Sequence, residues 1–107
     1  MEDNIIEASY FLGFARMDNE PRLFFFNIYG TRRLLIYDMI HSHWYEPRTT
    51  LYNAMLLILG EDCTILDIHT CRDDTDIEYM SATEFRRFDW SQLYWNSTKI
   101  IITASSK

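Results

Sequence analysis

The chain has 107 residues and a mass of 12.9 kDa, and its 10 Lys and Arg against 16 Asp and Glu give a formal net charge of -6. This length leaves little room for a second domain or for an array of ~35-residue repeats, and a hydrophobic fraction of 48% excludes intrinsic disorder. The acidic balance argues against direct binding to nucleic acid or to anionic lipid, because both need Lys and Arg. We therefore expect one globular domain over residues 1–107.

Nothing in the sequence predicts secretion or a membrane segment. The first residues, Met1-Glu2-Asp3-Asn4, are acidic where a secretory signal carries positive charge, and the longest purely apolar stretch, Ala54–Leu59, is far shorter than the ~18 residues of a membrane-spanning helix. Cys63 and Cys71 would lie ~26 Å apart on one extended strand, too far for a disulfide. We expect a cytoplasmic protein with reduced thiols and no membrane partner.

Three apolar runs occupy the first half of the chain. Tyr10–Met17 and Arg22–Tyr29 are typical of strands, and the residues between them, 18–21, favour a hairpin turn. After a break at Gly30-Thr31, the run Leu34–Ile40 would extend an antiparallel meander. A helix is the alternative for residues 4–17 and for residues 33–43.

The third quarter of the chain predicts a helix followed by a strand. Thr49-Thr50 can cap a helix over Leu51–Leu59, and Gly60 tolerates the left-handed conformation that ends one. Because nearly every residue of this helix is apolar, we expect it to be buried between the sheet and other core elements. The β-branched run Thr64–Thr70 is typical of a strand.

The last quarter predicts a divided helix and a final strand. Ser81-Ala82-Thr83-Glu84 matches a capping box, and Asp89-Trp90-Ser91-Gln92 repeats the pattern, so the helix would divide into two short pieces. Lys99–Thr103 would form the last strand, with a tail that frays from about residue 104. Together the elements predict an α+β fold, a mostly antiparallel sheet of four or five strands with two main helices packed on one face.

Common catalytic motifs are absent from the sequence. It contains neither a Gly-x-x-x-x-Gly-Lys-Ser/Thr loop nor Gly-x-Gly-x-x-Gly, and neither Gly-x-Ser-x-Gly nor His-Glu-x-x-His. The only lysines are Lys99 and Lys107, which removes most lysine-dependent chemistry. We expect a protein without enzymatic activity and without a cofactor.

Two residue pairs are candidates for a metal site. His41 and His43, like His69 and Cys71, would point to the same face of an extended strand, so two neighbouring strands could assemble a four-ligand zinc site. The Cys-x-x-Cys spacing of ordinary zinc modules is missing, and surface histidines with a buried thiol are the alternative. A nucleophile made of Cys63 or Cys71 with His41 or His43 has no local signature to support it.

The negative charge is concentrated in one segment. Residues 61–89 hold nine acidic residues against three arginines, whereas residues 1–60 carry -2 and residues 90–107 carry +2. Aromatic side chains beside clustered acids are typical of surfaces that steer and bind a basic protein. The alternative is that the aromatics belong to the core and the acids serve solubility or a helix N-terminus. The candidate partner-binding residues are Asp73, Asp74, Asp76, Glu78, Tyr79, Trp90, Tyr94 and Trp95.

Three functional hypotheses follow. The first is a small acidic inhibitor of a basic partner protein, either a nuclease toxin, which would make the chain an immunity protein, or a nucleic-acid-binding effector of phage defence. The second is a zinc-binding domain or small metal-assisted enzyme built on the two residue pairs above. The third is a structural, oligomer-forming subunit, because 3 Trp, 7 Tyr and 7 Phe exceed what so small a core needs.

Overall fold

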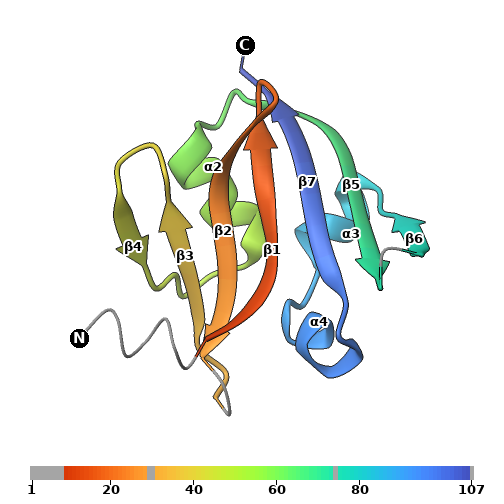
Figure 1. The fold of residues 1–107 in the computed structure, drawn as a ribbon. Coiled ribbons are helices and arrows are strands. Elements are labelled where there is room, and N and C mark those ends of the chain that lie inside the picture. The colour runs from red at the N-terminus through yellow and green to blue at the C-terminus, as the bar shows by residue number, and fades with distance from the viewer. Residues whose placement is uncertain (1–8, 29–30, 74, 107) are drawn as a thin grey trace.

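The fold is a single twisted sheet with helices on one side. The computed structural model describes residues 9–28, 31–73 and 75–106, without the side chains of residues 94–96. The strands are β1 (Ser9–Met17), β2 (Glu20–Ile28), β3 (Leu34–Asp38), β4 (His43–Tyr45), β5 (Thr64–Arg72), β6 (Asp76–Tyr79) and β7 (Lys99–Ser105). The described helices are α2 (Leu51–Leu59), α3 (Ala82–Arg86) and α4 (Ser91–Asn96). The strand order is β4-β3-β2-β1-β7-β5-β6, and these helices lie behind the sheet in Figure 1.

The predicted fold class is wrong. The sequence predicted four or five mostly antiparallel strands under two main helices, whereas the chain is mostly sheet, with seven strands and short helices in its described part. The sheet is mixed because β1 and β7 are parallel, while the other neighbouring strands are antiparallel. The two unpredicted strands, β4 and β6, are 3 and 4 residues long and form the edges of the sheet. Strands this short show no periodic pattern.

The first two strands form a hairpin with a tight turn. Asp18 and Asn19 have φ values of 54° and 68°, the left-handed backbone that a two-residue hairpin turn needs at both central positions. The helix alternative is excluded where the chain is described, since Ser9–Met17 and Leu34–Asp38 are strands. Residues 4–8 lie outside the described residues.

The parallel contact between β1 and β7 depends on a glycine. Gly13 lies next to a bulge in β1, has φ 144°, and pairs with Phe25 of β2 and Ile100 of β7. A Cβ atom at this position would lie 1.9 Å from the carbonyl oxygen of Ile100. A side chain is therefore incompatible with the spacing of the first and last strands.

The helix Leu51–Leu59 has the predicted bounds but not the predicted burial. Its N-cap, Thr50, accepts a hydrogen bond from the backbone N–H of Asn53, and Gly60 ends the helix. Leu51, Ala54 and Met55 are buried, but Leu57 is 75% exposed. The prediction that core surrounds this helix is wrong, because only one of its faces packs on the sheet.

The division of the last helical segment is confirmed. Ser81 and Glu84 form the predicted capping box of α3, and α4 follows as a separate short helix. The last strand continues to Ser105, past the predicted start of the frayed tail, and Ser106 donates hydrogen bonds from its backbone N–H and its hydroxyl to Asp18. These bonds attach the C-terminal end of β7 to the turn of the first hairpin.

The core lies between the sheet and the helices. The sheet contributes buried side chains that alternate along its central strands, and each helix adds at least one. The central residues are Leu12, Ala15, Leu23, Phe25, Ile36, Ile68, Ile100 and Ile102 from the sheet, with Leu51, Met55, Phe85 and Leu93 from the helices. None of the helices in the described ranges is long and apolar enough to cross a membrane. The cytoplasmic location stays a prediction.

We predict that Gly13→Ala destabilises the fold by about 3 kcal/mol, because it combines overpacking against a backbone with a strained φ. The measurement is urea unfolding followed by circular dichroism. Gly60→Ala is the matched control: its φ is 107°, but the nearest atom to an added Cβ is a side-chain oxygen of Asp62 at 3.2 Å. Equal losses in both variants would contradict the close-approach explanation.

The Asp18–Ser106 contact predicts a dependence of stability on pH. The hydroxyl and N–H of Ser106 lower the pKa of Asp18 below its ordinary value. Since the folded pKa is the lower one, the stabilisation is present above the unfolded pKa and is lost as pH falls through the folded pKa. We expect Ser106→Ala to lower the urea midpoint at neutral pH and to lower it less as the pH falls through the folded pKa of Asp18. A constant difference across this range would contradict the linkage.

Candidate binding site on the open face of the sheet

The face of the sheet opposite the helices, here called the open face, carries a continuous row of large side chains. Cross-strand partners share a face of a sheet, and the pairing links one residue from each of the seven strands. The row runs Trp44, Tyr37, Phe24, Phe14, Ile101, His69 and Tyr79. The row is aromatic from β4 to β1 and continues through Ile101, His69 and Tyr79 on the other three strands.

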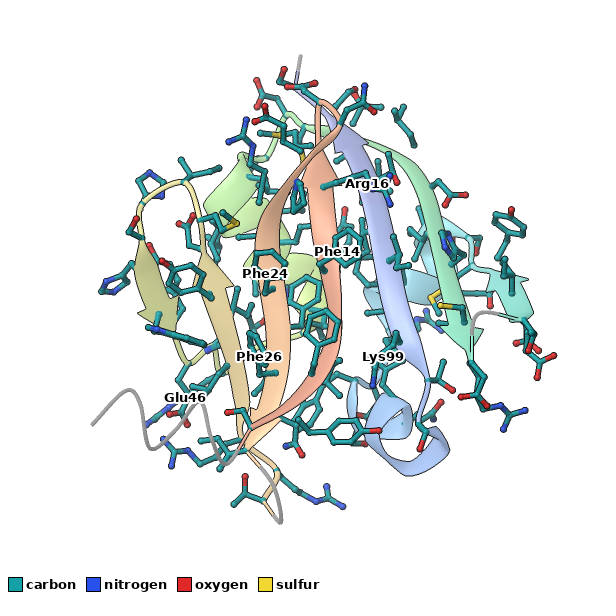
Figure 2. All side chains as sticks on the ribbon, in the orientation of Figure 1. Phe14, Arg16, Phe24, Phe26, Glu46 and Lys99 are labelled. Carbon is teal, nitrogen blue, oxygen red and sulfur yellow. The ribbon has the colours of Figure 1, made fainter. Side chains whose placement is uncertain are left out.

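Six rings on β1 to β4 pack against one another on this face. This aromatic cluster consists of Phe11, Phe14, Phe24, Phe26, Tyr37 and Trp44. Neighbouring ring centroids are 4.9 Å apart for Tyr37 and Trp44 and 6.5 Å apart for Phe11 and Phe24, within the range of favourable aromatic pairs. Figure 2 shows Phe14, Phe24 and Phe26 on the side of the sheet that faces away from the helices.

The aromatic cluster remains accessible to solvent. Phe11 is 38% exposed, and the other five rings are partly exposed. In a two-layer β-sandwich such a face is covered by a second sheet about 10 Å away. Here the described helices all lie on the other side (Figure 1), so the rings have no covering layer within the described part of the chain.

Cations border the aromatic cluster, but other groups engage them. The guanidinium of Arg16 lies 5.4 Å from the centroid of the Phe14 ring. The Arg22 guanidinium is 2.8 Å from a carboxylate oxygen of Glu20. Lys99, at the start of β7, lies 4.3 Å from the centroid of the Tyr10 ring. The positive charges near this face are thus already stacked on rings or paired.

One member of the predicted partner-binding set, Tyr79, lies at the β6 edge of the same face. Tyr79 is 74% exposed, and its ring centroid is 5.7 Å from that of His69. Asp73, Asp76 and Glu78 are exposed on the β5–β6 hairpin, but Asp76 and Glu78 alternate with Tyr79 along β6 and so point to the helix side of the sheet. Asp76 pairs with Arg72 at 3.2 Å. Asp74 lies outside the described residues.

The other predicted aromatics are not near Tyr79. Trp90 lies between α3 and α4 and packs against the core on the helix side of the sheet. Tyr94 and Trp95 belong to α4, but their side chains lie outside the described residues. The set of eight is therefore divided between the two sides of the molecule.

Several acids of the segment 61–89 have local structural partners. Glu84 completes the capping box of α3, and a carboxylate oxygen of Asp89 accepts the backbone N–H of Ser91. A carboxylate oxygen of Asp67 lies 2.7 Å from Nδ1 of His69. These acidic residues are therefore explained by helix ends and by a contact within the chain, and they require no partner protein.

The four candidate zinc ligands do not come together. His41 and His43 lie at the β4 edge, whereas His69 and Cys71 lie on β5, with four strands between β4 and β5. In the ranges 9–28, 31–73 and 75–106 no group of three or more His, Cys, Asp or Glu is placed to hold a metal. His41 instead pairs through Nδ1 with the buried carboxylate of Asp38 at 2.6 Å.

Both cysteines are free thiols, and the surroundings of Cys63 make it a poor nucleophile. Burial raises the pKa of the Cys63 thiol, and the neighbouring Asp62 carboxylate raises it further. The thiolate is the reactive form of cysteine, so a raised pKa keeps this thiol neutral and unreactive.

Sequence reasoning missed the aromatic cluster. The strand prediction for Tyr10–Met17 already includes apolar residues on both faces, and Arg22–Tyr29 likewise lacks polar alternation; the consequence for the open face is what the prediction lacks. A strand that is apolar on both faces has either a second layer or an exposed apolar face.

No family model matches the chain, and no curated protein or solved structure is significantly similar to it. Two features of the described residues stand out: the open face with its aromatic cluster, and the exposed acids of the β5–β6 hairpin.

We predict that Asp62→Asn, in a Cys71→Ser background that leaves one thiol, increases the rate of alkylation of Cys63 roughly twofold, because the substitution removes a charge that opposes the thiolate. The rate is measured with iodoacetamide at about pH 8. Glu61→Gln is the matched control, since it neutralises the adjacent acid, which is not among the causes of the raised pKa. Equal acceleration in both variants would contradict the specific effect of Asp62.

Proposed function

We propose that this chain is a protein-binding module that holds a basic partner protein on its open face and acts as an inhibitor. The observation that carries the proposal is the aromatic cluster, six packed rings that no described element covers. Exposed apolar patches on soluble domains commonly mark interaction sites, and aromatic residues are enriched in the centres of interfaces.

The shape of the face favours a macromolecular partner. The molecule measures 36 × 32 × 23 Å, so the sheet is wide enough to bury the about 800 Å² per partner of a stable protein interface. The aromatic rings also lose little conformational entropy on binding, because neighbouring rings already hold them.

Exposed acidic residues at two ends of the sheet favour a basic partner. Asp18 lies at the β1–β2 turn, and Asp73, Asp76 and Glu78 lie on the β5–β6 hairpin at the far edge of the sheet. Exposed acids of this kind increase the association rate of a positively charged protein by electrostatic steering. A nuclease toxin or a nucleic-acid-binding defence effector is basic for the same reason that it binds phosphates.

Nucleic acid fits this face less well than protein does. Aromatic sheets also bind single strands by stacking, but those surfaces supply free positive charge along the backbone of the ligand. Here Arg16 lies over Phe14 and Arg22 is paired with Glu20, while the net charge of the chain is -6.

The test is capture of proteins from an extract of the source cells by the immobilised chain and by two variants. In the first variant, Phe11 and Phe26 are both replaced by Thr, which preserves strand propensity. The control is Leu57→Gln, which removes an apolar side chain that is more exposed than Phe11 from α2, on the other side of the sheet. We expect a basic protein that the wild type and the control retain and that the double variant binds at least about tenfold more weakly.

Two outcomes would overturn the proposal. One is a captured protein that the double variant retains with unchanged affinity. The other is a dimer in sedimentation velocity that dissociates in the double variant, since the open face would then bind a second copy. Replacing Asp76 by Asn and Glu78 by Gln should slow association with the captured protein and weaken its salt dependence. An unchanged association rate would show that Asp76 and Glu78 do not contribute to binding.

A further inference from the structure

A concave site lies apart from the open face. It is a groove of about 560 Å³ formed by the start of β3, the linker between β4 and α2, and the linker between α3 and α4. Small-molecule sites in proteins typically measure about 300 to 1,000 Å³. Its lining residues are Arg32, Arg33, Leu34, Glu46, Pro47, Arg48, Thr49, Thr50, Arg87, Phe88, Asp89 and Trp90.

The groove is positive in a protein that is acidic overall. Four arginines line it against the two carboxylates of Glu46 and Asp89, a local excess of +2, whereas the whole chain carries -6. The four arginines come from three segments that are distant in sequence. Like charges gathered in one concavity repel one another, and an anionic ligand removes that repulsion.

One of the arginines already binds a carboxylate. Arg33 donates from Nε to one oxygen of Glu46 at 2.9 Å and from a terminal nitrogen to the other at 2.5 Å. This pairing lowers the pKa of Glu46, and the nearby charge of Arg48 lowers it further. In the described residues Arg32, Arg48 and Arg87 have no such carboxylate partner.

Internal hydrogen bonds hold the segments that present these side chains. The amide of Asn27, which is fully buried, donates to the carbonyl oxygens of Thr31 and Arg33 and so fixes the chain before β3. The backbone N–H of Arg87 donates to the carbonyl oxygen of Glu84 at the end of α3. Held segments lower the entropy cost of binding.

The groove also includes the N-terminal end of α2. Thr49 and Thr50 line it, and Thr50 is the N-cap of this nine-residue helix, whose first turn contains no acid. A helix N-terminus carries a partial positive charge that favours anions, and here no side chain in that turn neutralises it. Phe88 and Trp90 add an aromatic wall, since both are partly exposed beside the arginines.

We propose that this groove binds a small organic phosphate. The phosphoryl group would lie among Arg32, Arg48 and Arg87, because guanidinium groups bind phosphate oxygens through paired hydrogen bonds. The organic part would lie against Phe88 and Trp90. The site is independent of the open face, because its helix end and the α3–α4 linker belong to the helix side of the sheet (Figure 1).

The test uses AMP, pyrophosphate and adenosine as probes in isothermal titration calorimetry at low salt. We expect AMP and pyrophosphate to bind, AMP more tightly, and adenosine to show no measurable binding. Replacing Arg48 and Arg87 together by Gln should weaken AMP binding about tenfold. Arg72→Gln is the matched control, since it removes an exposed arginine from the β5–β6 hairpin and should leave affinity unchanged.

A variant that should bind AMP more tightly gives a more specific test. Glu46→Gln removes a negative charge from the groove and frees Arg33, so AMP binding should tighten about threefold. Amide chemical shifts should move at residues 48–50 and 87–90. The proposal is overturned if AMP fails to bind, if Glu46→Gln weakens binding, or if Arg72→Gln weakens it as much as the double variant does. Equal affinity for AMP and pyrophosphate would contradict the proposed contact of the organic part with Phe88 and Trp90.

Discussion

The parallel pairing of the first and last strands is the constraint on which the rest of the structure depends. It joins two antiparallel units, β4-β3-β2-β1 and β7-β5-β6, into one sheet. At Gly13 the backbones come so close that a Cβ atom would meet the Ile100 carbonyl. The pairing of β1 with β7 fixes how the two units are aligned, and it therefore also aligns their core side chains and the row across the open face.

The one-sided helix layer explains why the aromatic cluster is exposed. α2 has nine residues, and α3 and α4 have five and six, which suffices to cover one face of the sheet. The strands β1 and β2 nevertheless carry large apolar residues on both faces, as Phe25 and Phe24 illustrate. Burying apolar surface contributes about 25 cal/mol of stabilising free energy for each Å² removed from water. A partner that covers the exposed aromatic face would therefore gain this free energy on binding.

Local sequence signals predicted local structure well and long-range arrangement poorly. Thr50, Gly60 and the Ser81–Glu84 capping box marked helix ends correctly because the cap groups bond within a few residues. The parallel β1–β7 pairing and the edge strands β4 and β6 could not be predicted, because they depend on contacts between distant segments. Tyr79 and Trp90 show the same limit for the site, since these two residues of one acidic segment and its flank lie on opposite sides of the sheet.

Net charge proved an incomplete guide to the surface. The chain carries -6, yet the groove beside α2 has an excess of +2 because topology gathers arginines from positions 32, 33, 48 and 87. Charges in solution are screened within about 10 Å at 0.1 M salt, a distance short against the 36 Å length of the molecule. Each site therefore responds mainly to the charges around it, so an acidic β5–β6 hairpin and a basic groove can coexist in one small domain.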